Sequence, residues 1–208
     1  MKRLCPITES PSRLPRWFAL AITAVIAAPT AAWAHSEASH GGGLVAGFLH
    51  PISGLDHAVA MVAVGLWGAV LGPPALWVLP VAFPMVMAFG GLLALLGVPF
   101  PGVEIGIAVS GLVLGLLVLL ELRPPLGAAA LVVASFALFH GYAHGAELPP
   151  GGNALLYSLA FVVATGLLHL LGILLGEIRR WPGGRLGVRA AGAGVALVGF
   201  WFLRRALL

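Results

Sequence analysis

The sequence predicts an all-α membrane protein, a bundle of about six transmembrane helices that follows a cleaved signal peptide. Three observations support this fold: the composition, the pattern of the first 34 residues, and six later apolar stretches. The chain has 208 residues, of which 60% are hydrophobic and only 9% are charged, whereas a soluble domain carries about 25% charged residues. Its mean hydropathy is +1.05. This composition excludes an ordinary soluble globule, a nucleic-acid-binding protein and a disordered chain.

Residues 1–34 have the pattern of a secretory signal peptide. A basic region ends at Arg16, and a short apolar run, 17–28, is followed by Pro29 and by Ala32-Trp33-Ala34. A basic region, a short apolar core and an A-x-A-like site are typical of a cleaved signal. An uncleaved anchor helix that extends through Trp33 is the alternative, but Pro29 breaks the apolar run.

Cleavage after Ala34 leaves residues 35–208 as one polytopic transmembrane domain that begins with a short periplasmic segment. His35, its first residue, would offer an α-amine and an imidazole to one metal ion, and His40 follows closely. Taken alone, this segment is more simply interpreted as a solvated polar tail. The only cysteine, Cys5, would leave with the signal peptide, so the mature chain would have no thiolate for a metal or a disulfide.

Six apolar stretches follow, each close to the 20 or so residues that a helix needs to cross a bilayer core. Breaks that contain Pro or Gly separate them. The predicted spans are Leu55–Leu71, Ala75–Leu96, Val103–Leu122, Leu126–Gly145, Ala154–Ile178 and Leu186–Leu207. Two pairs of glycines at four-residue spacing, Gly111 with Gly115 and Gly172 with Gly176, predict close helix packing.

The arginines predict the orientation of the bundle. With a periplasmic amino terminus, alternation places the loops after the third and fifth spans, which carry arginines such as Arg123 and Arg180, in the cytoplasm. The two predicted outer loops contain no Lys or Arg, as the positive-inside rule expects. Arg204 and Arg205 would lie on the outer side and disagree mildly. The sequence therefore predicts a multi-pass protein of a bacterial inner membrane.

Polar side chains gather at one predicted membrane level. They are His50, Asp56 and His57 at the first span, Glu104 at the third, and His140, His144 and Glu147 at the fourth. A charged side chain in lipid costs about 2.5–3.5 kcal/mol on insertion scales, so such residues normally face the bundle interior and mark a function. Each has a simpler structural explanation, such as hydrogen-bonded packing, but four histidines and three acids at one level favour a metal site.

Residue spacing supports a shared site. His140 and His144 lie four residues apart and share a helix face, as do His57 and Met61. Asp56 would lie in the first turn of its helix, either as a ligand or as the partner that holds a histidine tautomer. Imidazole and carboxylate without thiolate suit Ni²⁺, Co²⁺, Zn²⁺ or Cu²⁺, and the ligand set alone does not choose among them.

Three motifs resemble those of the HupE/UreJ family. They are His50-Pro51-Ile52-Ser53-Gly54-Leu55-Asp56-His57, which runs on to Met61 and Gly65-Leu66-Trp67; His140-Gly141-Tyr142-Ala143-His144-Gly145-Ala146-Glu147; and Ala164–Gly172 around His169. Members of this family are membrane proteins associated with hydrogenase and urease accessory functions and are regarded as nickel permeases. The resemblance implies uptake of nickel, with cobalt as the alternative. It also implies metal-handling roles for His50, Asp56, His57, His140, His144 and Glu147.

The predicted function is a secondary transporter whose substrate is a divalent metal ion needed for hydrogenase or urease metallocentre assembly. The chain has no G-x-x-x-x-G-K-[ST] motif, and a divalent cation moving inward gains about 4.6 kcal/mol per 100 mV of membrane potential. Additional candidate ligands or pathway residues are His35, His40, Met61, Glu104 and His169. We expect no organic cofactor, no catalytic residues and no nucleic-acid partner; the expected partners are the metal, the bilayer and the maturation proteins of the recipient enzyme.

Two other functions stay open on the sequence alone. In an intramembrane zinc hydrolase, the four cluster histidines would hold Zn²⁺, and Asp56 or Glu147 would activate water. The chain has no substrate-binding domain, which disfavours this reading. A metal-binding or sensing protein that does not conduct would share the outer cluster and differ at His169 and the inner half of the bundle.

Overall fold

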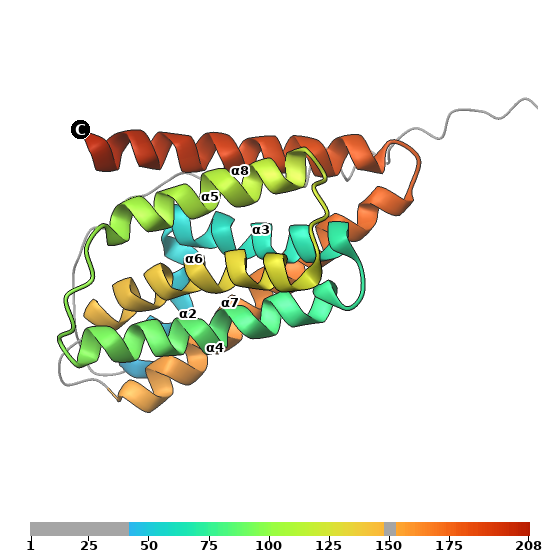
Figure 1. Ribbon diagram of the computed structural model, residues 1–208. Coiled ribbons are helices and arrows are strands. Elements are labelled where there is room, and N and C mark those ends of the chain that lie inside the picture. The colour runs from blue at the N-terminus through green and yellow to red at the C-terminus, as the bar shows by residue number, and fades with distance from the viewer. Residues whose placement is uncertain (1–41, 148–152) are drawn as a thin grey trace, which may run out of the picture. The chain divides into compact units, whose positions relative to one another are not determined.

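The computed structural model describes residues 42–147 and 153–208 and consists of helices over these two ranges (Figure 1). In chain order they are α2 (Gly42–Ser53), α3 (Leu55–Leu71), α4 (Ala75–Leu95), α5 (Val103–Leu119), α6 (Leu126–Ala146), α7 (Ala154–Glu177), the 3₁₀ turn η1 (Ile178–Arg180) and α8 (Gly184–Leu207). The predicted signal peptide with its cleavage site, together with His35 and His40, lies outside the described residues. The all-α prediction is confirmed for the part of the chain that the structure describes.

The prediction of six spans is corrected to four or five. Among the described residues, four helices (α4, α6, α8, and α7 continued through η1) are long and apolar enough to cross a membrane. A fifth span exists if α2 and α3, which are bent by 78° at their junction, count as one. The predicted span Val103–Leu122 falls short because α5 ends at Leu119 after 17 residues. Its end is set by Glu121, whose φ of 50° lies outside the helical region.

Helix α2 is a feature that the sequence did not predict, because Pro51 and Gly54 indicate a break there. The helix continues through Pro51, and the Ser53 hydroxyl donates to the His50 carbonyl at 3.0 Å in its last turn. Gly54 is extended, with φ −80° and ψ 107°, and turns the chain into α3. His50 therefore lies in the last turn of a helix, close to the first turn of α3.

Small residues let the helices pack closely within one chain. The largest contacts join α4 to α6, α5 to α8, and α3 to α7. Gly111 and Gly115 lie against α8, and Gly172 and Gly176 lie against α3. A Cβ at Gly115 or Gly172 would collide with the backbone of the facing helix, so the predicted packing role of both glycine pairs is confirmed.

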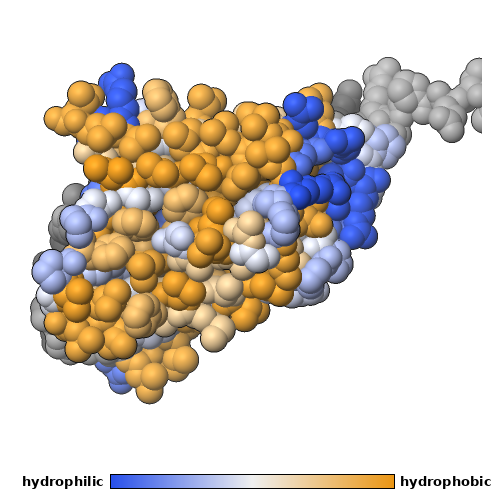
Figure 2. All heavy atoms as spheres, viewed as in Figure 1, coloured by the Kyte–Doolittle hydropathy of each residue, from blue (hydrophilic) through white to orange (hydrophobic). Residues whose placement is uncertain are grey.

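The outside of the bundle is apolar. Figure 2 shows hydrophobic residues along the helices and a hydrophilic area around the junction of α7 and α8. Large exposed side chains include Trp77, Leu131, Leu159, Leu174 and Leu197. Soluble monomers do not expose apolar surface on this scale, so the chain is a multi-pass membrane protein whose apolar faces meet lipid.

The bundle has two ends of different chemistry. We call the end at which α3, α5 and α7 begin (Figure 1) the histidine end, because it carries His50, His57 and His144. The opposite end, with Arg123 and Arg185, is the arginine end.

Candidate metal site

Six polar residues from three helices meet at the histidine end. His50 comes from α2, Asp56 and His57 from α3, and His140 and His144 from α6; Glu147 directly follows α6. His50 Nε2 lies 3.0 Å from His144 Nδ1 and 3.1 Å from Glu147 Oε2. The ring centroid of His57 lies 5.0 Å from that of His140 and 4.5 Å from that of His144. The structure thus brings together all six residues predicted to handle a metal, and we call them the histidine cluster.

The first turn of α3 orients the His57 ring. Asp56 Oδ1 accepts hydrogen bonds from the His57 backbone N–H and from ring Nδ1, each at 2.9 Å. The helix dipole stabilises a carboxylate in this position. Because a carboxylate only accepts hydrogen bonds, Nδ1 carries the proton and the lone pair of neutral His57 is on Nε2. This Nε2 is buried and has no hydrogen-bond partner among the described residues.

His140 is oriented in the same way by its own helix. Its Nδ1 donates to the Phe136 carbonyl at 3.0 Å, so its lone pair is also on Nε2. The ring is fully buried. Within residues 42–147 and 153–208, neither this Nε2 nor that of His144 has a hydrogen-bond partner. Histidines that bind metals are held by such hydrogen bonds from the other ring nitrogen.

The tightest group consists of His50, His144 and Glu147. One ligand atom from each lies within 4.8 Å of the other two. The hydrogen bond from His50 holds the pKa of the Glu147 carboxyl below its ordinary value. A divalent cation bound at His50 Nε2 would take the place of the proton that faces Glu147, and neutral His50 would then carry its proton on Nδ1.

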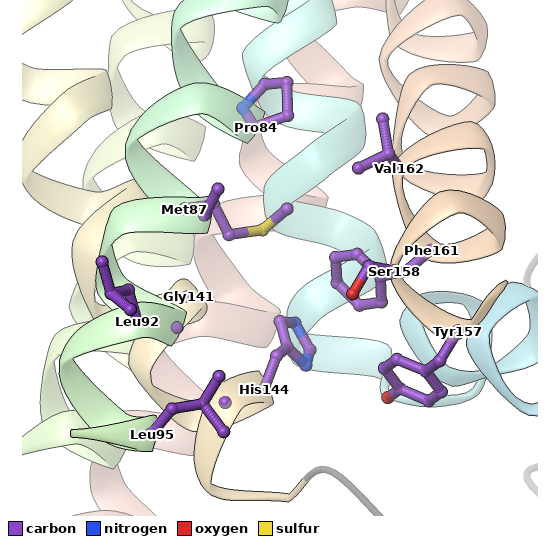
Figure 3. Close-up of a pocket in the computed structure, with 13 residues that line it drawn as sticks. Pro84, Met87, Leu92, Leu95, Gly141, His144, Tyr157, Ser158, Phe161 and Val162 are labelled. Atoms are coloured by element: carbon purple, nitrogen blue, oxygen red, sulfur yellow. The ribbon is translucent and has the colours of Figure 1, made fainter. Parts of the chain in front are cut away.

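Aromatic side chains of α7 border the cluster. The Phe161 ring centroid lies 4.4 Å from that of His144, and the Tyr157 ring centroid lies 6.0 Å from that of His50. A cavity of about 210 Å³ between α4, α6 and α7 reaches His144. In Figure 3 the His144 ring points from α6 into this space, toward Tyr157.

Phe83 of α4 contacts both His140 of the cluster and His169. It is fully buried, and its ring centroid lies 5.5 Å from that of His140 and 5.4 Å from that of His169. His169 itself is outside the cluster, on α7. Met61 is fully buried in the apolar core on α3.

Glu104 lines the same cavity as Asp56. Both carboxylates line a cavity of about 250 Å³ with Phe202, Arg205 and Ala206 from the end of α8. The Arg205 guanidinium lies 4.9 Å from the ring centroid of Trp201. Arg205, one of the two arginines that disagree mildly with the predicted orientation, therefore shares a cavity with two acidic residues.

The analysis of the sequence did not single out Phe83, Tyr157, Phe161 or Thr165. The sequence does contain a pattern that points to Tyr157, Phe161 and Thr165. They precede His169 at steps of four residues and so share its face of α7. Phe83 has no comparable signal. Its position depends on how α4 packs against α6.

The donor set of the cluster is imidazole and carboxylate. Buried polar atoms without partners cost free energy. Nε2 of His57, His140 and His144 has no partner in the described helices, and the lone pairs on His57 and His140 are ones that a bound cation would engage. Nitrogen and oxygen ligands of this kind suit divalent ions of the first transition row. The geometry therefore fits a divalent metal ion.

Comparisons with known proteins agree with the sequence motifs. The profile of the family described as HupE / UreJ protein matches residues 20–202. Protein HupE of Rhizobium leguminosarum bv. viciae is 48% identical over 176 residues, which cover 85% of this chain and 92% of that protein. No solved structure matches the chain. Because the match spans nearly the whole chain and all three motifs, the chain belongs to the HupE/UreJ family.

Proposed function

We propose that this protein is a permease that takes up a divalent transition-metal cation, Ni²⁺ in the first place and Co²⁺ as the alternative, for hydrogenase or urease metallocentre assembly. The observation that carries the proposal is the histidine cluster. It places buried imidazole nitrogens without partners in the described chain next to a compact His50–His144–Glu147 group in a multi-pass membrane protein. Membership in the HupE/UreJ family supports nickel as the substrate.

In this proposal, the histidine end faces the periplasm and the arginine end faces the cytoplasm of a bacterial inner membrane. The arginines support this orientation, because positive residues collect on the cytoplasmic side of membrane proteins. A signal peptide that ends at Ala34 would place the mature amino terminus on the same side as the cluster.

The exposure of the ligands defines an order of contact. The side chains of Glu147 and His50 are 55% and 31% exposed, the His57 side chain is 12% exposed, and His140 is fully buried. The ion would therefore meet Glu147 and His50 first and exchange water for carboxylate and imidazole there. His144 belongs to this outer group and lies beside His57, so it would pass the ion inward.

Membrane potential is a sufficient source of energy for this transport. A divalent cation that moves inward gains about 4.6 kcal/mol per 100 mV. A bound ion is exchanged between ligands that already have their orientation, since Asp56 and the Phe136 carbonyl hold the rings of His57 and His140. The delivered ion would pass to the maturation proteins of the recipient enzyme.

The test is ion flux into proteoliposomes that contain the purified full chain. Initial rates of Ni²⁺ uptake are measured under an inside-negative potential, with Co²⁺, Zn²⁺ and Cu²⁺ as competitors. We expect His57→Ala and His144→Ala to lose uptake while the protein still inserts and elutes as the wild type does. Ser135→Ala, which changes an exposed residue of α6, is the matched control and should transport normally.

Two results would overturn the proposal. Wild-type vesicles that take up Ni²⁺ no faster than empty vesicles would exclude a permease, and metal binding without flux would then favour a non-conducting binding protein. Normal uptake in both histidine variants would exclude the cluster as the transport site.

A further inference from the structure

Beyond the histidine cluster, α7 buries a second pair of polar side chains. Thr165 is 0% exposed and His169 is 1% exposed. They lie four residues apart, so they share a face of the helix. Thr165 Oγ1 and both ring nitrogens of His169 are buried without a hydrogen-bond partner in the described part of the chain. A phenylalanine or leucine would fill the same space without this cost, so packing alone does not explain the pair.

This pair lies deeper in the bundle than the cluster. The face of α7 that carries it begins with Tyr157 and Phe161, and Phe161 borders His144. At 1.5 Å per residue, His169 lies about 12 Å further along α7 than Phe161. The pair is therefore on the path from the histidine end toward the arginine end.

Helix α4 brings a backbone oxygen to the same level. Pro84 has no N–H, so it cannot bond the Pro80 carbonyl, which is its normal helical acceptor. This free carbonyl lies on the same turn of α4 as Phe83, whose ring centroid lies 5.4 Å from that of His169. The Phe83 ring also contacts His140 of the cluster, with 5.5 Å between the ring centroids.

Helix α3 closes the other side. Gly65 packs so tightly on α7 that a Cβ there would collide with the His169 backbone. The position of the His169 backbone is therefore fixed by direct contact between two helices. A side chain held in this way can keep a ligand atom in place.

We infer that His169, Thr165 and the Pro80 carbonyl form a second, inner binding site for the transported divalent cation, which the ion reaches from the histidine cluster past Phe83. This inference rests on the proposed function. One imidazole and two neutral oxygens bind a cation more weakly than the cluster does, and water completes the coordination. Conduction requires such a series of sites, each strong enough to be entered and weak enough to be left.

Binding stoichiometry tests the site independently of transport. The full chain is purified in detergent and dialysed to equilibrium against Ni²⁺ at saturating concentration. We expect His169→Phe to bind one ion fewer than the wild type. Ser110→Ala is the control: it removes a buried polar side chain whose hydroxyl already donates to the Ile107 carbonyl, and it should bind as many ions as the wild type.

Flux in proteoliposomes tests its place on the path. His169→Phe should lower the initial rate of Ni²⁺ uptake about tenfold or more, and Thr165→Val should lower it less. His169→Cys should retain uptake and shift the preference from Ni²⁺ toward Cd²⁺, because a thiolate is a softer ligand. A histidine that only packs would show no such change of preference.

The outcomes separate this inference from the proposed function. Equal stoichiometry in the wild type and His169→Phe, or a wild-type rate in His169→Phe, overturns the inner site and leaves the permease intact. Equal losses in His169→Cys and His169→Phe with unchanged ion preference also overturn it. If the wild type shows no flux but binds one Ni²⁺ ion more than His169→Phe, the inner site is supported and the permease is contradicted.

Discussion

The two ends of the helix bundle treat ionisable side chains in opposite ways. At the arginine end, Arg185 donates to both carboxylate oxygens of Glu121, with Nε to Oε1 at 3.1 Å. At the histidine end, Nε2 of His57 and of His140 has no partner in the described structure. The Glu121 carboxylate at the arginine end is therefore paired, and Arg179 Nε, which is buried there without a partner among the described residues, belongs to a cation and cannot bind a metal. At the histidine end the Nε2 atoms without partners have lone pairs that a cation would engage.

Burial explains why this difference matters. The Arg185 side chain is 73% exposed and the Glu121 side chain 13% exposed, and an ion pair whose arginine is in solvent contributes little to stability. Arg189 and Trp67 there donate to carbonyls at and beyond the end of α5, Leu119 and Leu122, each at 3.0 Å. The side chains of the arginine end therefore satisfy carbonyls at the end of α5. The buried polar groups of the histidine end are the ones that require a functional explanation.

The largest expected effect comes from a glycine that holds α6 against α4. In Gly141→Val the side chain would collide with the Met87 backbone, which would displace His140 and His144. We expect uptake to be lost and the free energy of unfolding to fall by about 1–3 kcal/mol, as overpacking does. Both are measured on purified protein, by flux and by thermal unfolding. Gly127→Val is the control on the same helix, because a Cβ at Gly127 meets open space; equal effects of the two changes would show that α4–α6 contact does not position the cluster.

A smaller effect is expected when the partner of His57 is neutralised. Asp56→Asn keeps the side-chain size but removes the carboxylate that accepts from His57 Nδ1. We expect Ni²⁺ to bind about 10–100-fold more weakly, as measured by calorimetry on the full chain. Glu121→Gln, the matched change at the arginine end, should leave the affinity as it is. If Asp56→Asn binds as tightly as Glu121→Gln, the carboxylate does not orient a ligand.

The smallest effect concerns stability at the arginine end. The hydrogen bonds from Arg185 hold the pKa of the Glu121 carboxyl below 4.5, so the charged pair stabilises the fold above the unfolded pKa and is lost as the pH falls through the folded one. We expect the unfolding temperature of the wild type to exceed that of Glu121→Gln slightly near neutral pH. The difference should vanish as the pH falls well below 4.5. A difference that persists in acid would mean that the contact does not depend on the carboxylate charge.

The sequence was sufficient to locate the six apolar helices α3 to α8. Their observed ends lie within three residues of those predicted, because Pro and Gly mark the breaks between them. Helix α2 escaped prediction because its helical geometry continues through Pro51. The chain bends by 78° at Gly54, and both α2 and α3 pack on α7. The predicted count of spans was too high because hydropathy shows where a segment is apolar but not where its backbone leaves the helix. The backbone leaves the helix at Glu121, for example.

The sequence was enough to predict which polar residues lie together at the histidine end, but not how their rings are oriented. Alternating helices were enough to place His50, His57 and His144 at one level. The orientation of each ring depends on single hydrogen bonds, from Asp56 and from the Phe136 carbonyl, and on aromatic neighbours such as Phe161. These follow from the rotation of each helix about its axis, which spacing along the chain does not determine.

The central claim is that the histidine cluster holds a divalent cation through imidazole and carboxylate. X-ray absorption by Ni²⁺ bound to the full chain tests it most directly, because the spectrum reports the ligand atoms themselves. We predict nitrogen and oxygen neighbours only, with outer scattering from at least two imidazole rings, as His50 and His144 would provide, and loss of that scattering in the double variant His50→Ala with His144→Ala. A spectrum without imidazole scattering, or one that the double variant leaves unchanged, would contradict the claim.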